Sequence, residues 1–156
     1  MQEFEVKLRL EAARYVLGMP FAGLGVLALA ALDAGWDCPA LRTLAGLDDA
    51  DEAELRSMFE DLLGELDVAA PAPGEAIKLL AKDIAVDIVE GRRSPQEGAE
   101  SLWDLANFIP PPPRYLHPFI YAASEMRDRP RDRAMFKKEI MRSARDLLED
   151  SSSGPT

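Results

Sequence analysis

The sequence predicts an all-α fold, a single compact irregular or orthogonal bundle of six to eight helices. Apolar residues recur every three or four positions in several segments, which is the spacing of one helix face. No segment shows the sustained alternation of apolar and polar residues, rich in β-branched side chains, that a strand needs. Glycine and proline interrupt the chain at short intervals. The 156 residues can bury a real core, so we expect one domain over residues 1–150 and a disordered tail over 151–156.

The first third of the chain predicts three helices. Residues 3–17 form an amphipathic helix that Gly18 ends, because glycine readily adopts the conformation that stops a helix. Residues 21–34 are almost wholly apolar, and we expect this helix at the centre of the core, where neighbours surround it. A short helical turn follows over residues 39–44, with Pro39 at its first position.

The apolar region has two interpretations, a membrane-spanning helix and a helix buried in the core. Tyr15 to Leu32 contains 18 uncharged residues, which meets the minimum length for a span. Gly18 and Pro20 interrupt this stretch, and Gly23 and Gly25 lower its helix propensity. We therefore predict a core helix and no membrane partner.

Residues 48–67 show the clearest helical pattern in the chain. Their apolar residues fall at i, i+3, i+4, i+7, i+8 and i+11, and Asp48 or Asp49 is the expected N-cap. These apolar residues are Leu55, Met58, Phe59, Leu62, Leu63 and Leu66.

Four further helices are predicted in the second half. Residues 77–88 repeat the apolar spacing, and 94–108 open with Ser-Pro-Gln-Glu, a capping-box arrangement. The four prolines of 110–113 predict an extended polyproline strut, followed by helices over 115–126 and 131–149. The residues that we expect in the core are Leu55, Phe59, Leu62, Ile77, Ile84, Leu102, Trp103, Phe136 and Ile140.

A faint internal similarity at an offset of 73 residues leaves a duplication open. It aligns Gly18 with Gly91 and Leu29 with Leu102, and both regions predict a helix, a glycine turn and a second helix. Helical periodicity alone can produce such matches.

The net charge of −10 is unevenly distributed. Residues 37–67 hold ten acidic side chains against two basic ones, whereas residues 127–145 hold eight basic side chains against three acidic ones. Because neutralising nucleic-acid phosphates requires a basic surface, the overall charge argues against general nucleic-acid binding. The acidic and basic segments are the most informative feature of the sequence. Either could be the working surface, or both could simply be solvated.

Residues with catalytic or metal-binding chemistry are scarce. His117 is the only histidine and Cys38 the only cysteine, so no disulfide within the chain and no thiolate zinc cluster can be built. A catalytic triad or a histidine-based acid has a single candidate histidine to use. Asp83 and Asp87 lie four residues apart on one helix face and could bind a divalent ion, but the apolar stripe beside them indicates a solvated face. We therefore predict no catalytic residue, metal or cofactor. The alternative is an enzyme or ligand-binding bundle that uses these aspartates with Tyr115 and His117.

The function predicted from these observations is that of a non-enzymatic interaction protein with a basic protein partner. In size, charge and helical class the chain resembles the immunity and inhibitor proteins of bacteria, which implies a partner with a basic functional cleft. A scaffold or an oligomeric assembly protein is a further alternative. The residues predicted to bind the partner are Asp48, Asp49, Asp51, Glu52, Glu54, Glu60 and Asp61.

Source and compartment are predicted from composition alone. Arginine outnumbers lysine 13 to 5, a bias typical of GC-rich bacterial genomes. The single cysteine suits a reducing cytoplasm, and the first residues lack the basic and apolar segments of a signal peptide. We therefore expect a bacterial cytoplasmic protein.

Overall fold

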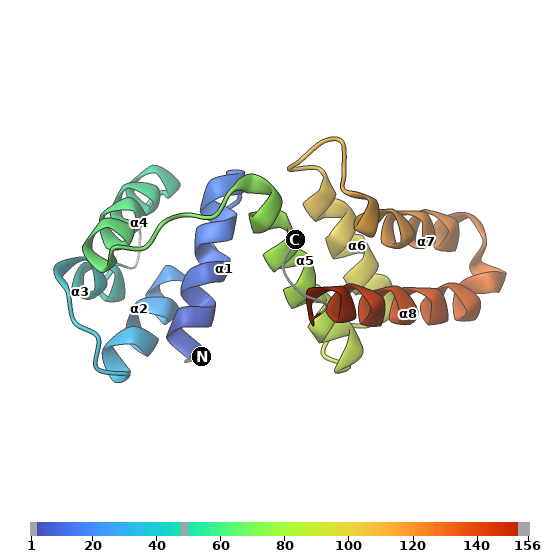
Figure 1. Ribbon diagram of the computed structural model, residues 1–156, viewed down its shortest axis with the longest axis horizontal. Helices are drawn as coiled ribbons and strands as arrows, with labels where there is room; N and C mark the ends of the chain where they lie inside the picture. The colour runs from blue at the N-terminus through green and yellow to red at the C-terminus, as the bar shows by residue number, and fades with distance from the viewer. Residues whose placement is uncertain (1–2, 48–49, 153–156) are drawn as a thin grey trace. The chain divides into compact units, whose positions relative to one another are not determined.

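The computed structural model describes residues 3–47 and 50–152 (Figure 1). Within these ranges the chain forms eight α-helices and two short 3₁₀ helices, and it contains no strand. The prediction of an all-α fold with six to eight helices is confirmed.

The helices fall into two compact units, residues 1–76 (unit 1) and residues 77–156 (unit 2). The prediction of a single domain over residues 1–150 stays a prediction. Unit 1 contains α1 (Glu3–Leu17), α2 (Leu24–Asp33), α3 (Pro39–Ala45) and α4 (Glu52–Leu66), and α5 (Pro73–Val89) crosses the division. Unit 2 continues with α6 (Pro95–Ala106), η1 (Arg114–Leu116), α7 (His117–Asp128), η2 (Pro130–Asp132) and α8 (Arg133–Ser152). Residues 153–156 of the predicted tail lie outside the described ranges.

Local sequence signals set most of the helix boundaries. Gly18, Gly35 and Gly91 follow α1, α2 and α5 with φ values of 73°, 96° and 81°, a left-handed conformation that a residue without a Cβ adopts at little cost. Ser94 caps α6 as predicted, because its side chain accepts a hydrogen bond of 3.1 Å from the backbone N–H of Glu97.

The start of α4 differs from the prediction. Asp51 is the N-cap, and its side chain accepts a hydrogen bond of 2.8 Å from the backbone N–H of Glu54. Asp48 and Asp49, the predicted caps, lie outside the described residues. All of these aspartates suit a cap, so the one that takes the role is set by where the helix begins rather than by residue type.

In unit 1, α2 packs against α1 and α3, and α3 packs against α4. Leu27, Leu41, Leu44, Phe59 and Leu62 are among its fully buried side chains. This core occupies one side of each helix, as expected for amphipathic elements.

The prediction that the apolar helix is buried on all sides is wrong. α2 buries Leu24, Leu27 and its neighbouring alanines, but Val26 is 61% exposed and Leu29 is 54% exposed. Its other face therefore lies open on the surface, because α1 and α3 cover only part of its circumference.

A buried carboxylate fixes the approach of α1 to the start of α2. The Glu11 side chain in α1 accepts hydrogen bonds of 3.0 Å from the backbone N–H groups of Ala22 and Gly23, and it pairs with Arg14. Glu11 is only 3% exposed. It supplies acceptors for the N–H groups of the two residues that precede α2, of which Gly23 is the N-cap.

In unit 2, α7 packs against α6 and α8, and α6 also contacts α8. Phe119, Leu116 and Met126 are fully buried between these elements. Of the residues predicted to lie in the core, six are buried, whereas Leu55, Ile84 and Trp103 are only partly buried. The six are Phe59, Leu62, Ile77, Leu102, Phe136 and Ile140.

Two further predictions can be compared with the structure. The backbone bends at residues 109–111, so the proline run is not one continuous polyproline helix. Residues 18–23 separate α1 from α2 inside the uncharged stretch. No helix of the described chain is long and apolar enough to cross a membrane.

Candidate partner-binding surface

The whole net charge of the protein belongs to unit 1. Residues 1–76 carry 15 acidic and 5 basic side chains, a net charge of −10, whereas residues 77–156 carry 13 of each. A net charge of this size in 76 residues creates a negative potential that attracts cationic partners over a range of about one Debye length.

Some of the predicted binding residues have structural roles within unit 1. Asp51 caps α4, and Glu60 accepts a hydrogen bond of 2.7 Å from the Tyr15 hydroxyl in α1. Arg56 lies on the same tyrosine, with its guanidinium 4.4 Å from the ring centre and 3.1 Å from the Tyr15 carbonyl oxygen. The hydrogen bond to Glu60, with smaller contributions from burial and from the negative charge of Glu60, raises the pKa of Tyr15. Glu60 therefore ties α4 to α1 and is not a free binding group.

Three predicted residues remain available to a partner. Glu52, Glu54 and Asp61 are exposed on α4, and their side chains form no hydrogen bond or ion pair with the described part of the chain. Glu54 and Asp61 lie seven residues apart, two helical turns on the same face. Asp48 and Asp49 lie outside the described residues.

Most basic side chains of unit 1 are already engaged. Lys7 pairs with Glu3, Arg14 with Glu11, and Arg42 with Asp37 through two hydrogen bonds of 2.7 and 2.9 Å. The hydrogen bonds from Arg42 lower the pKa of the Asp37 carboxyl group. The carboxylates of α4 that face solvent therefore have little local cationic compensation.

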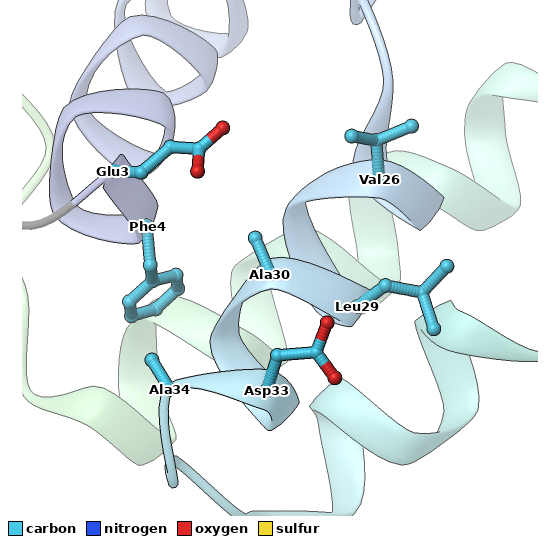
Figure 2. Close-up of a pocket in the computed structure, with 7 residues that line it drawn as sticks. All are labelled: Glu3, Phe4, Val26, Leu29, Ala30, Asp33 and Ala34. Carbon is cyan, nitrogen blue, oxygen red and sulfur yellow. The ribbon is translucent and has the colours of Figure 1, made fainter.

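A second surface feature of unit 1 is an apolar groove between α1 and α2, which we call the α1/α2 groove (Figure 2). Its volume is about 580 Å³. Glu3 and Phe4 come from α1, and the other lining residues come from α2 and the turn after it (Figure 2). The lining residues are Glu3, Phe4, Val26, Leu29, Ala30, Asp33 and Ala34.

The composition of α2 indicates an exposed apolar face as one of two outcomes, but the spacing of its apolar residues does not decide between them. The ten residues of α2 include a single charged side chain, Asp33. Such a helix has no polar face to place against water, so either neighbours cover it entirely or an apolar face stays exposed. We predicted the first outcome, whereas the structure shows the second, with Val26 and Leu29 exposed.

The residues of the alternative enzyme or ligand site do not form one cluster of free groups. Asp87 accepts hydrogen bonds of 2.8 Å from Arg92 and 3.0 Å from Arg93. Burial acts to raise its pKa, but these hydrogen bonds outweigh burial, so the pKa of Asp87 is lowered. Asp83 shares the α5 face, and His117 is exposed at the start of α7. The described residues contain no group of three His, Cys, Asp or Glu side chains placed to hold a metal ion.

Tyr115 is the remaining residue of that alternative. Its hydroxyl group is buried without a hydrogen-bond partner among the described residues, and burial raises its pKa to about 12. The Lys78 ammonium lies 5.9 Å from the centre of its ring. With this raised pKa the hydroxyl stays protonated at neutral pH.

The basic segment of unit 2 is exposed but partly paired. Arg129 contacts Glu125 and Asp132 at 3.4 and 2.7 Å, and Arg127 lies over the Trp103 ring, with 5.1 Å to its centre. These acidic neighbours reduce the local positive field, and unit 2 as a whole is neutral.

No family model matches the chain, and no curated protein or solved structure matches it at a significant level.

Proposed function

We propose that this chain is a non-enzymatic inhibitor- or immunity-type protein of the bacterial cytoplasm, and that unit 1 binds a partner protein with a basic surface. The observation that carries the proposal is the confinement of the entire net charge of −10 to unit 1. Complementary fields of this kind accelerate the encounter of two proteins and orient them before contact.

The exposed carboxylates of α4 support this proposal. Glu54 and Asp61 share one face, and their carboxylates have no partner within the described chain, so these carboxylates can pair with lysine or arginine without losing an existing contact. The apolar groove on the same unit supplies a surface of the type that interfaces bury, with charged residues at its edge. A cationic cleft with apolar positions is the complementary partner surface.

The test begins with capture of the partner from the native host at low salt, followed by association kinetics with the purified partner. Glu54→Lys/Asp61→Lys should slow association by about tenfold or more at low ionic strength, because the reversed charges repel the partner. The difference should shrink at high salt, where exposed charges are screened. Asp61→Lys alone should give the same direction of change, and it leaves the first turn of α4 intact.

The matched control is Asp104→Lys/Asp146→Lys. Both aspartates are exposed helical residues of unit 2 without a partner in the described chain, and the double variant changes the net charge by the same amount. It should leave the association rate within about twofold of the unmodified protein. Equal slowing by the two double variants, or no slowing by either, would contradict the role of the α4 face.

A further inference from the structure

We infer that the α1/α2 groove is the docking site for an amphipathic helix of the partner, with apolar side chains on one face and lysine or arginine beside them. This inference rests on the proposed function, and it identifies the surface that the partner covers and the element that covers it.

The groove has an apolar lining, and its α2 side is exposed. Val26 and Leu29 are more than half exposed, and the Phe4 ring forms part of the floor (Figure 2). The Trp36 ring packs against Phe4, with ring centres 5.3 Å apart, and is itself 41% exposed. Apolar side chains gathered in this way mark sites that another surface covers.

The negative charge at the edge of the groove specifies a basic occupant. Glu3 and Asp33 line the groove with their carboxylates, and the only cation bound to either among the described residues is Lys7, at 3.7 Å from Glu3. Asp33 is the last residue of α2, where the helix dipole is also negative. An acidic side chain at this end is unfavourable in the free protein, and a lysine or arginine of a partner would relieve that repulsion.

A helix is the element that fits between α1 and α2. The described chain has no strand, so it presents no sheet edge to which an extended peptide could add. The exposed Val26 and Leu29 and the partly buried Ala30 follow helical spacing, and an occupying helix can set its own i, i+3, i+4 and i+7 side chains against them.

A second copy of this chain is a poorer occupant than a basic partner. Bringing two copies of unit 1 together would oppose two net charges of −10, and the carboxylates at the two groove edges would repel each other.

The test uses the full chain and a synthetic helical peptide of about five turns, with leucine at i, i+3, i+4 and i+7 and lysine elsewhere. Binding is measured by calorimetry and by the fluorescence of Trp36 in a Trp103→Phe background, where it is the sole tryptophan. The amphipathic peptide should bind and change the Trp36 emission. A peptide of the same composition with scrambled order should bind at least about tenfold more weakly.

Variants of the groove locate the site. Val26→Ser/Leu29→Ser should weaken peptide binding by about tenfold or more. Met135 is an exposed apolar residue of unit 2, and Met135→Ser should leave peptide binding unchanged. Asp33→Asn should weaken binding about two- to fivefold at low salt and not at high salt. Because Val26 and Leu29 are exposed, the serine variants should keep the helical circular dichroism of the unmodified protein.

Several outcomes would overturn the inference. Equal binding of the ordered and scrambled peptides, or binding unaffected by the serine variant, would exclude helix docking in the groove. A chain that dimerises by sedimentation and loses the dimer in Val26→Ser/Leu29→Ser would make a second copy the occupant. Failure of the peptide alongside charge-dependent partner association would overturn only this inference. Peptide binding without an effect of the α4 reversals would overturn only the proposed role of α4.

Discussion

At the residue scale, Glu11 stands out as a charged side chain that is buried, with 3% of it exposed. Phe4, Leu8, Glu11 and Ala12 follow the i, i+4, i+7, i+8 spacing of a buried face, and all four are buried. A carboxylate in such a stripe is tolerated only where donors satisfy it. Here the two N–H groups before α2 and the Arg14 guanidinium do so.

Glu11→Ala should therefore lower the free energy of unfolding by about 2–4 kcal/mol, because it leaves two backbone donors and a partly buried arginine without their acceptor. Glu11→Gln should also destabilise the protein, since its amide group turns one acceptor into a donor. Urea denaturation followed by circular dichroism measures both. Asp61→Ala is the control and should stay within about 0.5 kcal/mol of the unmodified protein; a similar loss in both alanine variants would contradict the role of Glu11.

At the scale of helices, Gly98 sets the approach of α6 to α5. A Cβ atom built on Gly98 would overlap the side chain of Ile88, which is fully buried and has little room to move. The glycine is therefore required by packing rather than by backbone conformation. Gly64 in α4 differs, because a Cβ there would meet nothing within 4 Å.

Substitution by alanine should have opposite effects on stability at Gly98 and Gly64. Gly98→Ala should destabilise the protein by about 1–3 kcal/mol through overpacking against Ile88. Gly64→Ala should stabilise it by about 0.5–1 kcal/mol, since alanine has the higher helix propensity and no contact opposes it. Thermal and urea unfolding of both variants provide the measurement. Changes of the same sign would show that packing does not distinguish the two positions.

At the scale of the whole molecule, the two units differ in how charge affects their stability. Unit 1 carries the full net charge of −10 and is destabilised by repulsion among its carboxylates. Unit 2 is neutral, and it contains ion pairs such as those of Arg92 and Arg93 with Asp87 and of Arg129 with Asp132. Salt screens the repulsion among the carboxylates of unit 1 and the attraction within the ion pairs of unit 2.

Raising the salt concentration from about 20 mM to about 300 mM should therefore increase the stability of unit 1 and decrease or leave unchanged that of unit 2. Amide hydrogen exchange resolves the units, with greater protection expected in α2 and α3 and no gain in α6 and α7. Gly64→Ala serves as a reference, because it should raise protection in unit 1 at both salt concentrations. An equal response of the two units would contradict a charge-based difference.

The two halves of the chain share an order of elements that a duplication would produce. Each half of the chain places a helix, a left-handed glycine and a second helix in the same order, with Gly18 and Gly91 at equivalent positions. The packing differs, since α6 contacts both α7 and α8, whereas the main contacts of unit 1 follow chain order. Duplication stays a hypothesis.

The sequence by itself determined the helical class, most helix boundaries and the uneven distribution of charge. These follow from local physics: glycine adopts a positive φ, Ser94 can cap the helix that starts at Pro95, and apolar side chains at helical spacing form one face. The acidic α4 face could be predicted for the same reason, since its apolar stripe leaves the other positions in water.

Only the tertiary structure decided which neighbours each helix receives. Periodicity identifies an inner face by contrast with a polar one, and α2 has no polar face, so its exposed Val26 and Leu29 could not be predicted. The burial of Glu11 required knowing that the start of α2 lies against α1. Where a helix has no polar face, the burial or exposure of its side chains depends on contacts with segments distant in sequence. Those contacts form only when the helices pack.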